Sequence, residues 1–91
     1  MDIVIEQLEE EPWEFAVGLR EVDENLGDFI VTMSEEEYAT FGEGAEPREV
    51  ISATFRFLLD REEPESISDR FCLQDILQYY PEYTTQLTSY F

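Results

Sequence analysis

The segment from Val50 to Leu59 constrains the fold of this 91-residue chain more than any other. Placed on a helical wheel, its apolar side chains and Thr54 cover about 240° of the circumference. A helix that lies on a protein surface has a narrower apolar face, because its remaining side chains must meet water. The segment therefore predicts a central helix over residues 47–62, with Pro47 in the first turn, where a missing N–H is tolerated.

Two segments that alternate apolar and polar residues precede this helix. The alternation predicts a half-buried strand from about 13 to 22 and a second strand around Phe29, Val31 and Met33. Residues 23–27 (DENLG) carry turn-favouring types, so the two strands are predicted to form a hairpin. An earlier strand around Ile3–Leu8 is also predicted, although a short helix fits those residues nearly as well.

The other helices are indicated by capping and proline signals. Ser34 followed by Glu37 reads as a capping box and predicts a short helix over 35–41. A second short helix is predicted over about 64–70. A third spans Leu73–Tyr80 and is ended by Pro81.

The tail, residues 83–91, fits a helix end, an added strand or frayed chain, and its residue types favour a strand. Together the elements predict an α+β fold, in which a two- or three-stranded antiparallel sheet packs on three or four helices. Residues 1–91 are expected to form a single domain.

The charge is extreme, because 23 Asp and Glu residues face five arginines, with no lysine and no histidine, for a net charge of −18. Residues 1–46 form an acidic region of net charge −14, residues 47–82 a helical region, and residues 83–91 an uncharged aromatic tail. With 43% hydrophobic and 14% aromatic residues, the chain has too much core material for an acidic disordered tail.

Several classes of chemistry are made improbable by the residues that are missing. The absence of histidine removes the commonest general base and a favoured zinc ligand. Asp23, Asn25 and Asp28 are similar to a calcium loop, but the glycine and the last ligand are out of register. Cys72 lies in an apolar stretch, which favours a buried side chain over a reactive thiol. The sequence therefore predicts a protein that is not an enzyme and has neither cofactor nor metal.

Location and nucleic-acid binding follow from the same composition. The N-terminus has no basic region followed by an apolar run, and no segment approaches the ~18 apolar residues of a membrane helix. A single cysteine gives no internal disulfide. A cytoplasmic protein is expected, with no membrane binding, and with no direct nucleic-acid binding because phosphates repel its carboxylates.

From Trp13 to Tyr83, about three quarters of the chain, the layout resembles a small uncharacterised bacterial family. The matching stretches are Val31-Thr32-Met33, residues 53–62 (ATFRFLLDRE), residues 66–71 (SISDRF) and residues 79–83 (YYPEY). The resemblance implies a β-hairpin followed by helices and implies no function. This chain departs from the family in lacking lysine and histidine and in its extended acidic N-terminus.

Aromatic and acidic clusters suggest a protein–protein interaction domain. Aromatic enrichment with few charges is typical of the core of an interface. The predicted partner-binding residues are Glu35, Glu36, Glu37, Tyr79, Tyr83, Tyr90 and Phe91. An unidentified protein is the expected partner, and a second copy of the chain is another candidate, through an uncovered sheet edge or the aromatic tail.

Two other functions remain open at this stage. A folded acidic protein can imitate DNA and inhibit a nucleic-acid-binding protein, its carboxylates standing in for phosphates. Phe29–Glu62 also follows the strand, short helix, longer helix order of ribbon-helix-helix proteins, as a dimerisation scaffold rather than a DNA reader. The acidity also fits two explanations that involve no binding partner, namely adaptation to a saline cytoplasm and solubility.

Overall fold

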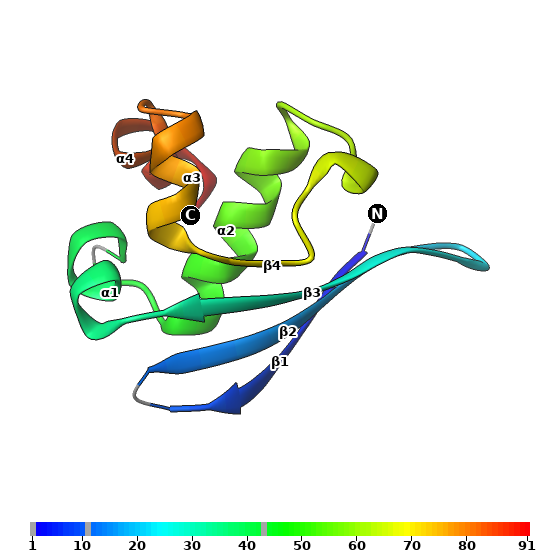
Figure 1. The fold of residues 1–91 in the computed structure, drawn as a ribbon, viewed down its shortest axis with the longest axis horizontal. Coiled ribbons are helices and arrows are strands. Elements are labelled where there is room, and N and C mark those ends of the chain that lie inside the picture. Colours follow the sequence, from blue (N-terminus) through cyan, green and yellow to red (C-terminus); the bar gives the residue numbers. More distant parts are fainter. Residues whose placement is uncertain (1, 11, 43) are drawn as a thin grey trace.

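The computed structural model describes residues 2–10, 12–42 and 44–91, and its helices lie on one side of a four-stranded sheet (Figure 1). The strands are β1 (Asp2–Glu9), β2 (Trp13–Glu21), β3 (Glu24–Met33) and β4 (Arg70–Cys72). The helices are α1 (Glu35–Phe41), α2 (Pro47–Leu59), α3 (Leu73–Tyr79) and α4 (Tyr83–Gln86), with 3₁₀ turns η1 (Pro64–Ser66) and η2 (Leu87–Tyr90). The α+β class is as predicted.

The sheet is mixed, which differs from the predicted two or three antiparallel strands. Its order is β1-β2-β3-β4, with β1, β2 and β3 antiparallel and β4 parallel to β3. Ile5 pairs with Val17, and Phe15 pairs with Val31. Since side chains alternate across a sheet, this register places these apolar residues on the face that meets the helices. Residues 3–8 thus belong to a strand and not to a helix.

Helix α2 lies at the centre of the core, as its apolar circumference predicts. Seven of its thirteen side chains are buried, and they pack with the inner face of the sheet and with residues from the other helices. The helix ends at Leu59, three residues before the predicted end. The buried Thr54 of this core donates a hydrogen bond to the Val50 carbonyl, so its hydroxyl is satisfied within the helix.

The segment after η1 was expected to be helical to about residue 70 but instead joins the sheet as β4. Ile67 and Phe71 are buried, as the helical prediction also required. The edge of β3 left open by β2 supplies backbone partners: the Ile30 N–H donates to the Asp69 carbonyl (2.8 Å), and Val31 pairs with Phe71. Burial of this edge requires such partners, which a helix could not provide. β4 pairs with β3 over residues 30–32, so this part of the edge is not available to a second copy, as a ribbon-helix-helix-like scaffold built on it would need.

The hairpin turn is shorter than predicted and uses Asp23, whose φ is 61°, as its left-handed residue. Asn25 and Gly27 lie in β3, where they hold Arg20. The Arg20 guanidinium donates to Asn25 Oδ1 (2.7 Å), to Asp28 Oδ1 (2.8 Å) and to the Gly27 carbonyl (3.2 Å). The guanidinium lies so close to Gly18 that a Cβ on residue 18 would be 2.7 Å from the guanidinium atoms. Asn25 and Gly27, which suggested a turn in the sequence, therefore bind Arg20 on the outer face of the sheet.

The tail is helical and packed, in contrast to the predicted strand. Leu87 is buried, and Arg61 holds the tail by donating to Gln86 Oε1 (2.7 Å) and Glu82 Oε2 (3.2 Å). Figure 1 shows α4 beside α3. In the described residues, no helix has the length and apolar character needed to cross a membrane.

Candidate binding groove

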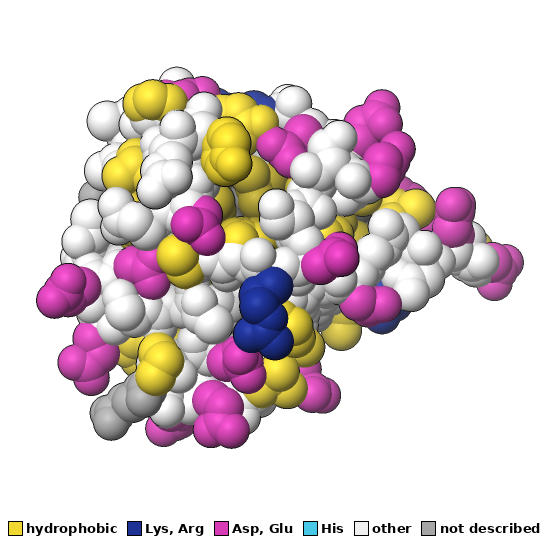
Figure 2. Space-filling model, in the orientation of Figure 1, with side chains coloured by type: hydrophobic (Ala, Val, Ile, Leu, Met, Phe, Trp, Pro, Cys, Tyr) yellow, Lys and Arg dark blue, Asp and Glu magenta, His cyan; other side chains and the backbone are white. Residues whose placement is uncertain are grey.

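A groove opens between the end of α2, the η1 turn, β4 and α3. It encloses about 260 Å³, and Figure 2 shows apolar side chains in a hollow between α3 and the turn that follows α2. The ten lining residues are Leu58, Glu62, Ser66, Ile67, Ser68, Phe71, Asp75, Ile76, Tyr79 and Tyr80. None of these ten residues of the described chain is basic. The groove is thus an apolar depression with an acidic and aromatic rim.

One wall is fixed by the route of the chain from α2 to β4. The Glu62 N–H donates to the Leu58 carbonyl (2.8 Å), which extends the helical turn far enough to place the Glu62 side chain at the rim. Pro64 then begins the η1 turn, and the buried Ile67 ties the loop to the core. Phe71 follows in β4 and is locked by its pairing with Val31. This wall therefore rests on rigid elements.

The opposite wall is α3, whose start is fixed by two carboxylates. Asp75 Oδ2 accepts the Cys72 N–H (3.2 Å), and Glu37 Oε2, from α1, accepts the Gln74 N–H (2.7 Å). These bonds satisfy backbone donors that the first turn of a helix leaves without intrahelical partners. Asp75 and Tyr79 lie four residues apart, as do Ile76 and Tyr80, so each pair shares a helix face. Two such faces make one side of the groove.

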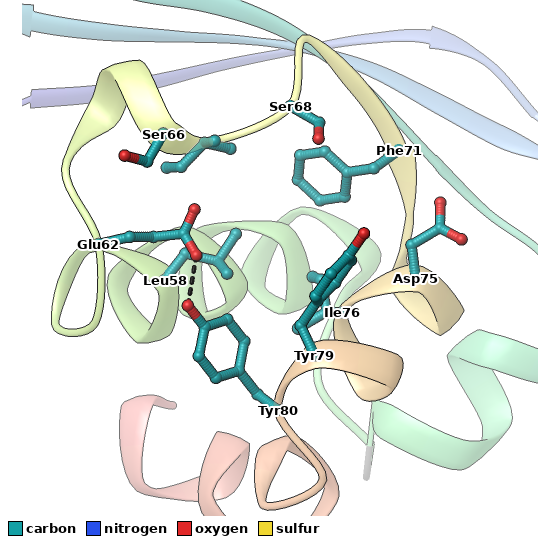
Figure 3. Close-up of a pocket in the computed structure, with 10 residues that line it drawn as sticks. Leu58, Glu62, Ser66, Ser68, Phe71, Asp75, Ile76, Tyr79 and Tyr80 are labelled. Carbon is teal, nitrogen blue, oxygen red and sulfur yellow. Dashed lines mark hydrogen bonds between the residues drawn. The ribbon is translucent and has the colours of Figure 1, made fainter.

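Figure 3 shows how the polar groups are distributed around the apolar floor. Glu62 and Tyr80 lie at one end, where the Tyr80 hydroxyl donates to the Glu62 carboxylate. That hydrogen bond raises the pKa of Tyr80 above its usual value, because ionisation would break it and place two negative charges together. Asp75 and Phe71 lie at the other end, and the Tyr79 ring extends toward Phe71. The groove offers carboxylate acceptors and aromatic faces, which suit a cation or an amphipathic side chain.

Of the aromatic residues predicted to bind a partner, Tyr79 alone lines this groove, with 79% of its surface exposed. Phe91 is also exposed, at the C-terminus. Tyr90 is half-buried and donates to Asp60 Oδ2 (2.5 Å). Tyr83 is fully buried, and its ring packs on Phe57 at 5.2 Å between centroids. Tyr83 is therefore a core residue, and its side chain cannot contact a partner of the folded protein.

The three predicted acidic contacts also have different environments. Glu35 and Glu36 are exposed in the first turn of α1. Glu37 completes the predicted capping box, since its Oε1 accepts the Ser34 N–H (2.8 Å) while Ser34 Oγ accepts the Glu37 N–H (3.1 Å). Its second oxygen serves α3, so Glu37 joins two helices and has a structural role.

The structure also locates the calcium-like residues and the cysteine. Asn25 and Asp28 are bound to Arg20, and Asn25 also donates a hydrogen bond to Asp28. The hydrogen bonds from Asn25 and Arg20 lower the pKa of Asp28, and the one from Asn25 is the largest cause. No cluster of three or more His, Cys, Asp or Glu side chains able to hold a metal occurs in residues 2–10, 12–42 and 44–91. Partial burial raises the pKa of the Cys72 thiol, which keeps it protonated and poorly nucleophilic.

Sequence reasoning missed most of the groove, namely Glu62, Asp75 and the residues of its floor. The spacing of Asp75 with Tyr79 was a usable signal, because it puts an acid beside an aromatic ring on one face of α3. Glu62 had no such signal: it stands in an acidic run after α2, and its direction depends on how the chain turns at Pro64.

Comparison of the chain with protein-family models, with curated proteins and with solved structures finds no match in any of the three. The function therefore has to be inferred from the groove, the charge and the exposed surfaces themselves.

Proposed function

We propose that this protein is a non-catalytic interaction domain that binds another protein through the groove between α2, η1, β4 and α3. The observation that carries the proposal is the open apolar floor of the groove beside Tyr79, a large aromatic side chain left 79% exposed at the end of α3. Exposed aromatic residues next to apolar pockets are typical anchors of protein interfaces.

The size of the groove favours a side chain of a protein over a free metabolite. Sites for drug-sized ligands have volumes of roughly 300–1,000 Å³ and enclose most of the ligand. This groove, at about 260 Å³, is smaller and open on one side. A single protruding side chain fits such a depression, while the rest of the partner contacts its rim.

Acidity adds selectivity to this interaction. A net charge of −18 attracts basic partners from a distance and repels nucleic acid and other acidic proteins. Imitation of DNA is the rival use of the same charge. In Figure 2 the acidic side chains are scattered around the visible face with apolar and uncharged atoms between them, so that face offers no unbroken row of carboxylates.

A site-specific photo-crosslinker tests the proposal. Replacing Tyr79 by p-benzoylphenylalanine in the full chain should capture one partner from native lysate, identified by mass spectrometry. Phe91 is the matched control, because it is an exposed aromatic residue outside the groove. Equal capture from positions 79 and 91, or none from position 79, would contradict a groove-centred interface. Loss of the position-79 product on addition of duplex DNA would favour the DNA-mimic function instead.

A further inference from the structure

The protein already contains one arginine-binding arrangement, on the side of α2 that meets the tail. The Arg61 guanidinium lies over the Phe57 ring, with Cζ 3.8 Å from the ring centroid. Arg61 Nε donates to Glu82 Oε2 (3.2 Å), and Nη1 approaches the Tyr90 hydroxyl (3.4 Å). Arg61 also donates to Gln86 Oε1 (2.7 Å) and to the Phe57 carbonyl (3.2 Å), so an aromatic face, a carboxylate and a tyrosine hydroxyl are three of the groups that hold its guanidinium.

The groove presents the same three kinds of group without an arginine of its own. Phe71 and Tyr79 supply aromatic faces, Asp75 supplies a carboxylate at the same end, and Tyr79 supplies a hydroxyl (Figure 3). Asp75 accepts the Cys72 N–H through Oδ2, and its carboxylate also forms a hydrogen bond with the Cys72 thiol. A carboxylate has about four lone-pair positions, so Asp75 retains capacity for a further donor.

The surroundings of the groove are negative as well. Glu62 faces the groove from its other end, Glu63 precedes the η1 turn, and Glu65 lies within that turn. A hydrogen bond between the carboxyl groups of Glu63 and Glu65 raises the pKa of Glu63, as expected where like charges are crowded. A cation entering the groove is attracted by the carboxylates of Glu62 and Asp75, which line it, whereas a neutral side chain of the same shape is not.

We infer that the groove binds an arginine side chain of the partner protein, an inference that rests on the proposed function and names its anchor. The guanidinium stacks on the Tyr79 ring and donates to Asp75, while its aliphatic stem lies on Ile76 and neighbouring apolar floor residues. Arginine fits better than lysine, because its flat cation stacks on aromatic rings and donates two parallel hydrogen bonds to one carboxylate.

The test uses blocked tripeptides, N-acetyl-Gly-X-Gly-amide, titrated into the ¹⁵N-labelled full chain and followed by NMR. With X as arginine, shifts should concentrate on amides of residues 66–80, at millimolar affinity. Citrulline has the shape of arginine without its charge and should bind about threefold to tenfold more weakly, the usual value of one cation–π contact and one exposed ion pair. Lysine should fall between the two.

Variants locate the site. Asp75→Asn keeps an oxygen for the Cys72 N–H but removes the charge, and Tyr79→Ala removes an exposed ring; each should reduce arginine binding at least threefold. Glu36→Gln is the matched control, since it removes one exposed charge outside the groove and should leave binding unchanged. Equal binding of citrulline and arginine, or an equal loss in Glu36→Gln, would overturn the inference. That result, combined with crosslinking specific to position 79, would leave the groove interface standing with a different anchor.

Discussion

The buried pair of Tyr83 and Thr54 gives the sharpest prediction about stability. The two hydroxyl oxygens lie 2.8 Å apart in the core, and Thr54 Oγ1 lies 2.7 Å from the Val50 carbonyl, to which it donates. A threonine hydroxyl has one proton, so Tyr83 must be the donor in the bond between the two hydroxyls. The direction of this bond makes the two single substitutions unequal.

Tyr83→Phe removes the donor but leaves Thr54 bonded to Val50, so it should cost about 0.5–1.5 kcal/mol, the net value of one hydrogen bond. Thr54→Val leaves the Tyr83 hydroxyl buried without its partner and should cost about 1–3 kcal/mol. The double variant leaves no buried donor without a partner. Its loss of stability should therefore be about 1 kcal/mol smaller than the sum of the losses in the two single variants.

Urea unfolding followed by Trp13 fluorescence measures these free energies, because the Trp13 ring packs edge-on against Tyr38 at 5.0 Å and should report loss of the fold. Thr40→Val, at an exposed threonine of α1, controls for the change of residue type. Additive costs in the double variant, or a Thr54→Val protein as stable as the wild type, would refute the assigned direction of the hydrogen bond.

Four other outcomes follow from the structure. Leu87→Ala should destabilise the folded protein by about 2–5 kcal/mol, because it leaves a cavity at a buried site in the tail. The control Thr88→Ala changes an exposed neighbour and should alter the urea midpoint little. Equal effects of the two substitutions would mean that the tail is not packed. Ser34→Ala should cost about 1 kcal/mol by removing the cap of α1, measured by the same unfolding assay; an unchanged midpoint would rule out the capping bond. Burial raises the pKa of Tyr83, so the stability that this residue contributes is fully present below about pH 10. This stability should fall as the pH rises further, because the tyrosine ionises first in the unfolded chain. Tyr83→Phe should reduce this loss of stability at alkaline pH. Salt should raise the melting temperature of this −18 chain and level off near 0.5 M, where the Debye length is about 4 Å, whereas a continuing rise in molar KCl would indicate saline adaptation.

Local patterns predicted most of the fold because their physical causes are local. Alternation in β2 and β3, the capping box at Ser34 and the stop at Pro81 each depend on neighbours within a few residues. The apolar circumference of α2 located the centre of the core for the same reason. β4 could not be found in this way, because three residues acquire strand geometry only by pairing with a distant edge of β3.

The aromatic tail shows why the predicted site was partly misplaced. Composition alone cannot distinguish aromatic residues that finish a core from those that form an interface, since both are apolar and uncharged. The decisive contacts are long-range: Arg61 in the segment after α2 binds Gln86, and Thr54 in α2 binds the Tyr83 hydroxyl. Because the buried Leu87 lies within residues 84–91, removal of these residues is expected to destabilise the fold.

The acids serve different purposes on different surfaces, and this bears on the choice of partner. In the described sheet β1 has β2 as its one neighbour, so its outer edge is open to another strand. Asp2, Glu6 and Glu9 lie along that strand, and two copies paired there would bring like charges together. We expect these acids to oppose self-association through this edge, as charged residues commonly do on edge strands. The acids of the groove flank an apolar floor and aromatic rings instead. Under the proposed function, the groove is the surface where negative charge would select a partner, and a flat cation that stacks on Tyr79 while pairing with Asp75 would be its most selective ligand.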